Sequence, residues 1–240
     1  MENYAIHKLD KIDSTMNYAK QLAENGCKNF TVVTAKLQKN GRGRLERKWL
    51  SEIGGLYFTI VLKPKIAIKK AFVYNFAASS AIAETLKYLF KIDAKLKWPN
   101  DVHISGKKIC GILSEIKIKE NGIDYINIGI GLNVNNPISA AEIKSVSVNQ
   151  ITGQTESKTK ILETFLINFQ KKIEPNKHNK IISEWKTKNI TVGAFVTVKT
   201  ANKKIEGEAI DIDRSGALVV ITDNFRIKKI SHGDCFHLSE

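Results

Sequence analysis

A glycine- and arginine-rich loop in the first fifth of the chain has the composition of an anion-binding site. Residues 41–44 read Gly-Arg-Gly-Arg and lie in a segment, residues 38–49, that shows no apolar periodicity. Glycines let a backbone fold closely around phosphates, and arginine pairs with phosphate oxygens in a two-pronged geometry. The chain contains no G-x-x-x-x-G-K-[ST] Walker A motif, and the segment is not a dinucleotide-binding fingerprint, because Glu46 occupies the third glycine position. We expect a mobile phosphate-binding loop; a solvated surface loop or an arginine–glycine stretch that binds nucleic acid are the alternatives.

Polar side chains also follow an apolar run at residues 97–101, which read Lys-Trp-Pro-Asn-Asp. The predicted strand stops at Pro99, so the amide of Asn100 and the carboxylate of Asp101 lie at a strand end. Ligand sites of α/β proteins often form at such ends. The same residues are good turn formers, and an ordinary turn is the plainer interpretation.

Glycines within two later strand-like runs could open a slot in a sheet. Lys108 borders an apolar run in which Gly111 leaves room for a ligand near the backbone. Gly129 and Gly131 alternate along another run, so one face of that strand lacks side chains, and Asn133 could hydrogen-bond whatever fills the slot. For Lys108, a solvated lysine on a hairpin is the plainer interpretation.

The elements that must position these residues follow from apolar spacing and turn signals. Helical spacing predicts helices at residues 16–26, 68–91, 157–173 and 179–188. Strand-like runs cover residues 4–12, 30–37, 56–62, 94–98, 107–118 and 125–134, the last two joined by an Asn121-Gly122 hairpin. Asp13-Ser14-Thr15 offers N-cap chemistry for the first helix, and Gly26 ends it. From about residue 190, short strand candidates between small turns predict a small β-barrel or sandwich.

Composition and charge restrict the class of protein. With 42% apolar residues, the 240-residue chain cannot be wholly disordered. The excess of 38 Lys and Arg over 24 Asp and Glu gives a charge of +14, which favours an anionic partner. Nucleic acid, nucleotide phosphates, an acidic protein and anionic lipid all qualify. Without a long apolar stretch, a signal sequence or paired cysteines, we expect a cytoplasmic protein with no membrane span.

The order of these motifs resembles the biotin–protein ligases. Ser14-Thr15 comes first, then the Gly-Arg-Gly-Arg loop with Trp49 five residues on, then residues 97–101, 108–115 and 129–135. The resemblance covers residues 13–135 and implies an α+β fold. Residues 1–188 would form a class II synthetase-like catalytic domain with a mixed β-sheet backed by helices. Residues 189–240 would form a small SH3-like β-barrel.

The resemblance also implies a reaction and its partners. ATP and biotin, with Mg²⁺, would give biotinyl-5′-AMP, and biotin would pass to a lysine of a biotin carboxyl carrier protein or domain. Asp13-Ser14-Thr15 comes so early that we expect no DNA-binding domain, no specific nucleic acid and no repressor function. We expect a monomer or homodimer with no membrane partner. Alternatives are a lipoate ligase or octanoyl transferase of the same fold, and a nucleic-acid-binding module.

Site residues follow from the same resemblance. The catalytic group would be Lys108, Arg42, Arg44 and Asp101, the last also the Mg²⁺ ligand. Ligand binding would fall to Ser14, Thr15, Met16, Gln38, Gly41, Gly43, Trp49, Asn100, Gly111, Ile112, Leu113, Gly131 and Asn133. In these roles Ser14, Thr15 and Gln38 meet biotin's ureido head, Trp49 stacks on adenine with Asn133 nearby, and Lys108 bridges biotin's carboxylate and the α-phosphate. Two departures are Glu46, where the family's loop has glycine, and Met16, where asparagine is common.

Overall fold

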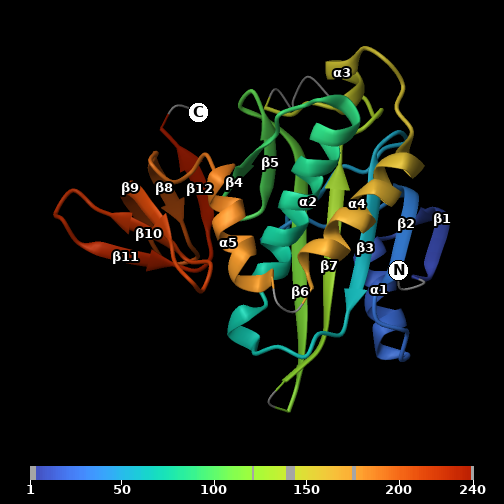
Figure 1. The fold of residues 1–240 in the computed structure, drawn as a ribbon, viewed down its shortest axis with the longest axis horizontal. Coiled ribbons are helices and arrows are strands. Elements are labelled where there is room, and N and C mark those ends of the chain that lie inside the picture. The colour runs from blue at the N-terminus through green and yellow to red at the C-terminus, as the bar shows by residue number, and fades with distance from the viewer. Residues whose placement is uncertain (1–3, 121, 139–143, 175–176, 239–240) are drawn as a thin grey trace. The chain divides into compact units, whose positions relative to one another are not determined.

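The chain folds into two compact units, each built from two separate stretches of sequence. The structure, a computed structural model, describes residues 4–120, 122–138, 144–174 and 177–238 (Figure 1). The first unit combines Met1–Ala71 with Lys107–Thr164, and the second combines Phe72–Gly106 with Phe165–Glu240. Each unit is described by itself.

The first unit is built on a mixed sheet with the strand order β1-β2-β3-β7-β6. Strand β1 (Ile6–Ile12) runs parallel to β2 (Thr31–Gln38). The pairs from β2 through β3 (Leu56–Leu62) and β7 (Gly122–Leu132) to β6 (Lys107–Lys119) are antiparallel. Every residue of β3 is buried, which agrees with its uninterrupted apolar sequence. The expected mixed sheet is confirmed.

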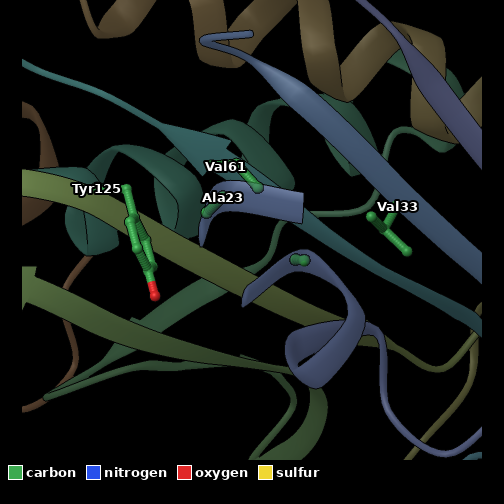
Figure 2. Packing of buried hydrophobic residues seen from close by; sticks show 5 residues of the cluster. Ala23, Val33, Val61 and Tyr125 are labelled. Carbon is green, nitrogen blue, oxygen red and sulfur yellow. The ribbon is translucent and has the colours of Figure 1, made fainter. Parts of the chain in front are cut away.

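Helix α1 (Thr15–Glu24) lies on one face of this sheet. Its small residues, including Ala23, pack on Val33, Val61 and Tyr125 from three different strands (Figure 2). Small side chains let the helix approach the strands closely, and these contacts hold the middle and C-terminal part of α1 against the sheet. Gly26 follows the helix with φ +79°, as its expected stop requires.

Two further helices belong wholly or partly to this unit. Helix α3 (Val148–Thr152) begins with a capping box between Ser147 and Gln150. Helix α4 (Lys158–Lys172) starts in the first unit and ends in the second.

The second unit contains a helical pair, a short hairpin and a small β module. Helix α2 (Val73–Phe90) packs on α5 (His178–Thr187), where the rings of Phe76 and Trp185 stack at 4.4 Å. The hairpin pairs β4 (Lys95–Lys97) with β5 (Asp101–Ile104). The module is an antiparallel five-stranded sheet in the order β11-β10-β9-β8-β12. Its strands are β8 (Phe195–Lys199), β9 (Lys204–Ile212), β10 (Leu218–Ile221), β11 (Ile227–Ile230) and β12 (Asp234–His237).

The structure differs from the sequence predictions at several boundaries. The helix expected at 68–91 is a 3₁₀ turn, η1 (Ile68–Lys70), followed by α2. Strand β5, with 4 residues, and helix α3, with 5 residues, were missed because such short elements repeat their apolar spacing too few times to be recognised. The hairpin expected at Asn121-Gly122 lies partly outside the described residues. None of the helices in the described ranges is long and apolar enough to cross a membrane.

Candidate active site

Three glycines on neighbouring strands form a slot in the first unit's sheet, filled by two side chains of the same unit. A Cβ built at Gly131 would lie 2.4 Å from Cε2 of Trp49, and one at Gly111 would lie 2.8 Å from Cζ3 of the same ring. A Cβ at Gly129 would lie 2.6 Å from Sδ of Met16. A side chain at Gly111 or Gly131 would therefore displace the Trp49 ring, and one at Gly129 would move the flexible end of Met16. We call Gly111, Gly129 and Gly131 the glycine slot.

Lys108 lies at the Trp49 end of the glycine slot. Its Nζ is 5.3 Å from the centroid of the Trp49 ring, and 3.3 Å from a Cβ built at Gly111. Its backbone is fixed on both sides, since its N–H donates to the Lys144 carbonyl at 2.7 Å and its carbonyl accepts from Val146 at 3.0 Å. A cation beside a flat aromatic ring suits an anionic group attached to a planar base.

The indole N–H of Trp49 shows that the ring is packed in place without a polar anchor. Its Nε1 is buried and has no hydrogen-bond partner among the residues that the structure describes. Packing contacts alone are easier to exchange for a ligand's contacts than a hydrogen bond would be. The ring can therefore yield to, or stack on, a flat ligand.

A network of polar groups surrounds the N-terminus of α1. The backbone N–H and the hydroxyl of Thr15 both donate to Oε1 of Gln38, at 2.8 and 2.9 Å. Thr59 donates its hydroxyl to Thr15 Oγ1 at 2.9 Å, and Gln38 Nε2 donates to Ser51 Oγ at 2.8 Å. These bonds join α1, β2 and β3 and set the orientation of each polar group.

Two buried polar side chains on this side of the sheet lack partners. Ser14 Oγ and both amide atoms of Asn127 have no hydrogen-bond partner among the described residues, and both residues are only 1% exposed. Ser14 occupies the N-cap position of α1, yet its hydroxyl makes no capping bond, contrary to the expected N-cap chemistry. Buried polar atoms are rarely left unsatisfied, so a ligand that both donates and accepts hydrogen bonds fits this end of the slot.

Asn127 was not predicted as a site residue from the sequence. A signal was available, because Asn127 is the polar exception in the otherwise apolar run from Tyr125 to Ile130. It alternates with Gly129 along β7, so both face the same side of the sheet.

The glycine-arginine loop is tied down in the structure at its first arginine. Arg42 pairs with Glu115 on β6 and donates from Nη1 to Asn17 Oδ1 at 3.1 Å. Gly41 packs tightly, since a Cβ there would lie 2.4 Å from Ser51 Oγ. The backbone N–H of Gly43 donates to the carbonyl of Arg47, and the backbone N–H of Arg47 donates to the carbonyl of Arg44. The loop is thus a folded turn; its expected phosphate contacts remain a prediction.

The remaining first-unit candidates differ in which way they point. Leu113 pairs with Gly129 and shares the face of the glycine slot, whereas Ile112 alternates to the opposite face and is 2% exposed. Asn133 is bound within the protein: its Nδ2 donates to the Val146 carbonyl at 3.3 Å, and its Oδ1 accepts from Asn136. Ile112 can therefore offer a ligand only its backbone, while Asn133 holds the end of β7.

Asn100 and Asp101 belong to the second unit. They follow the Trp98-Pro99 peptide, and Asp101 opens β5 opposite Lys97. Asn75 Nδ2 donates to the Pro99 carbonyl at 3.2 Å, which ties this turn to α2. Within the described ranges, no three His, Cys, Asp or Glu side chains gather as a metal site would need.

The fold and the site define a class: a mixed α+β ligand-binding domain followed by a small antiparallel β module. The model of the Biotin/lipoate A/B protein ligase family matches residues 9–133. The Biotin protein ligase C terminal domain matches residues 192–238. The chain therefore belongs to the biotin/lipoate A/B protein ligase family, as the motif order indicated.

Similar proteins cover almost the whole chain. The "Bifunctional ligase/repressor BirA" of Bacillus spizizenii is 32% identical over 94% of this chain and 71% of its own length. The "Biotin--[acetyl-CoA-carboxylase] ligase" of Paracoccus denitrificans is 30% identical over 88% of this chain and 92% of its own. The biotin protein ligase of Aquifex aeolicus, solved in complex with biotin and ATP, superposes with a TM-score of 0.83 at 29% identity, covering 97% of both chains.

Proposed function

We propose that this chain is an ATP-dependent biotin–protein ligase that makes biotinyl-5′-AMP and transfers biotin to a lysine of a biotin carboxyl carrier domain. One observation carries the proposal: Lys108 and Trp49 lie at one end of the glycine slot. In support, the relative from Paracoccus denitrificans is named a biotin–[acetyl-CoA-carboxylase] ligase, and the Aquifex aeolicus structure holds both biotin and ATP.

The first step joins two anions. A carboxylate oxygen of biotin attacks the α-phosphorus of ATP, the new O–P bond forms, and the bond to pyrophosphate breaks. The reactants repel each other, so positive charge fixed between them lowers the barrier. Lys108 supplies that charge, while the slot and Trp49 hold the adenylate in line.

The second step needs no covalent enzyme intermediate. The amine of a carrier lysine attacks the acyl carbon, the C–O bond to AMP breaks, and the amine loses a proton as the amide forms. In this step the protein orients the adenylate and shields it from water until the carrier arrives.

Biotin's ureido head matches the polar end of the site. The head offers N–H donors and a carbonyl acceptor, and the Ser14 hydroxyl can pair with either. Thr15 and Gln38 already form a fixed network beside it. Lipoate has no ureido group and would leave the buried polar atoms unsatisfied, which favours biotin over lipoate.

We also propose a magnesium contact. Adjacent oxygen donors on Asn100 and Asp101 fit Mg²⁺, which usually takes one or two carboxylates and completes its shell with phosphates and water. When bound, the ion would neutralise the triphosphate. The division into a catalytic domain at 1–188 and a β module at 189–240, and a cytoplasmic location, remain predictions.

The test is incubation of the protein with ATP, Mg²⁺, biotin and a biotin carboxyl carrier domain, with the acceptor mass read out. The expected result is one biotin added per acceptor, dependent on ATP and lost when the acceptor lysine is replaced. A parallel reaction with lipoate should leave the acceptor unmodified. Lipoylation without biotinylation would overturn the choice of substrate.

A separate expectation is that the 240-residue chain does not repress transcription. Its +14 charge should give only weak, salt-sensitive DNA binding. A gel shift with promoter DNA at physiological salt measures this; a tight, sequence-specific shift would contradict it.

A further inference from the structure

Arg42 is held by a carboxylate rather than pointing freely toward a ligand. Its Nη1 lies 3.2 Å from Oε2 of Glu115, and its Nη2 contacts Oε1, so the pair is bidentate. Nη1 also donates to Asn17 Oδ1 at 3.1 Å. Bidentate arginine–carboxylate pairs fix orientation as well as distance.

The contact continues into a connected series of polar side chains. Asn17 Nδ2 donates to Asp13 Oδ2 at 3.1 Å, and Asn40 Nδ2 donates to Asp13 Oδ1. We call Asp13, Asn17, Asn40, Arg42 and Glu115 the clasp. It ties the glycine-arginine loop to α1 and β6 immediately beside Ser14 and Thr15, which are the biotin-head candidates.

The clasp lies far from Lys108 along the same strand. The Nζ of Lys108 lies beside Gly111, and four residues of β6 lead from Gly111 to Glu115, which corresponds to roughly 13 Å of extended strand. Glu115 pairs in register with Asn127, and Lys108 precedes the Gly111 end of the slot. In addition, the Glu115 carboxylate already balances the positive charge of Arg42. Both facts argue against Arg42 as the partner of the phosphates.

We infer that Glu115 is a positioning residue for the head of biotin: it holds Arg42, and through Arg42 the loop, over Ser14 and Thr15. This inference rests on the proposed function. The expectation from the resemblance was that Arg42 closes over the phosphates. The inference instead leaves the phosphates to Lys108 and other cations. The two roles of Arg42 predict different effects of its loss. If Arg42 positions the loop over the head of biotin, biotin affinity falls; if it contacts the phosphates, the KM for ATP rises.

The test uses Glu115→Gln, Arg42→Gln and the double variant. Glu115→Gln keeps the shape of the side chain and removes its charge. The control is Asp10→Asn, which removes the exposed ion pair with Lys36 between β1 and β2. Titration with biotin alone gives the dissociation constant, and steady-state kinetics give the KM for ATP.

Each single variant is expected to weaken biotin binding about tenfold, the usual scale for losing a charge-assisted hydrogen bond. The double variant should lose little more, because both changes break one contact. The KM for ATP should stay within about twofold, since no phosphate contact is lost. Unchanged biotin affinity in Glu115→Gln, or a rise confined to the KM for ATP, would overturn the inference.

Amide hydrogen exchange of the ligand-free protein tests the role of Glu115 in holding the loop independently of the proposed ligase function. Loss of Glu115's charge should speed exchange across residues 39–49, whereas Asp10→Asn should not. If the wild-type protein bound no biotin, the proposed function would fail, and the exchange data would still decide whether Glu115 holds the loop. Equal loop exchange in wild-type and Glu115→Gln protein would rule the clasp out.

Discussion

The Nζ atom of Lys108 lies 5.3 Å from the centroid of the Trp49 ring, although 59 residues separate them in the chain. The same ring covers Gly111 on β6 and Gly131 on β7, which pair as antiparallel neighbours. A cation, an aromatic plane and a strip of bare backbone thus meet at one place. That combination suits an adenylate, with its phosphate at the lysine and its base against the ring.

Gly131→Ala should damage this place specifically. The added Cβ would lie 2.4 Å from a Trp49 ring carbon, so the ring must shift. We expect at least a tenfold loss of biotin-dependent pyrophosphate exchange, about 1.4 kcal/mol of transition-state stabilisation. Gly122→Ala on the same strand is the matched control, because a Cβ there meets nothing within 4 Å. Equal activity of the two variants would contradict a tight slot.

Ser14→Ala should weaken biotin binding without weakening the fold. The hydroxyl is buried and makes no capping bond, so the usual cost of about 1 kcal/mol for losing a helix cap should be absent. Binding should weaken about tenfold if the hydroxyl pairs with biotin. Calorimetric titration and urea unfolding measure the two effects. A loss of stability with full biotin affinity would show that Ser14 serves the helix.

Much of this site could be predicted from local sequence. The alternating Gly129 and Gly131 indicated a bare strand face, and motif order selected Lys108 and Trp49. The pair between Arg42 and Glu115 could not be predicted, because it joins a loop residue to a strand residue 73 positions away in the chain. Asn127 was also missed, because its polar side chain stands out from the apolar run but the run does not show what that side chain faces. Its register in the folded sheet revealed its position.

Lys172→Met should destabilise the second unit. The Lys172 Nζ lies 2.7 Å from Glu84 and 3.0 Å from Glu184, which joins α2, α4 and α5. Burial opposes the charged form, but the bonds to both carboxylates outweigh it and raise the pKa of Lys172. We expect a loss of about 1–2 kcal/mol in the free energy of unfolding, because the carboxylates stay partly hydrated.

Lys180→Met is the matched control for Lys172. Its Nζ lies 3.7 Å from the same Glu184 carboxylate, and its side chain is 72% exposed. The loss there should stay below about 0.5 kcal/mol. Equal effects of the two substitutions in urea unfolding would show that the ion pairs of Lys172 with Glu84 and Glu184 do not stabilise the second unit.

Tyr74 should make the fold sensitive to high pH. Burial raises the pKa of Tyr74 from 10.0 to about 12, because ionisation would place a charge in the core. As pH rises, the unfolded chain therefore loses this proton first. The contribution of neutral Tyr74 to the free energy of unfolding is complete below pH 10 and is lost as pH rises towards 12. Between pH 8 and pH 11, the free energy of unfolding should fall by about 1 kcal/mol more in the wild-type protein than in Tyr74→Phe. Parallel pH curves for the two proteins would contradict this.

The central claim is that Lys108 cancels the repulsion between biotin's carboxylate and the α-phosphate. Biotin-dependent exchange of pyrophosphate into ATP measures that step directly. The comparison is Lys108→Ala against Lys107→Ala, since Lys107 is the neighbouring lysine on β6 and its side chain is exposed. The account predicts at least a hundredfold loss for Lys108→Ala with an unchanged unfolding temperature, and near wild-type exchange for Lys107→Ala. Wild-type exchange by Lys108→Ala would contradict it.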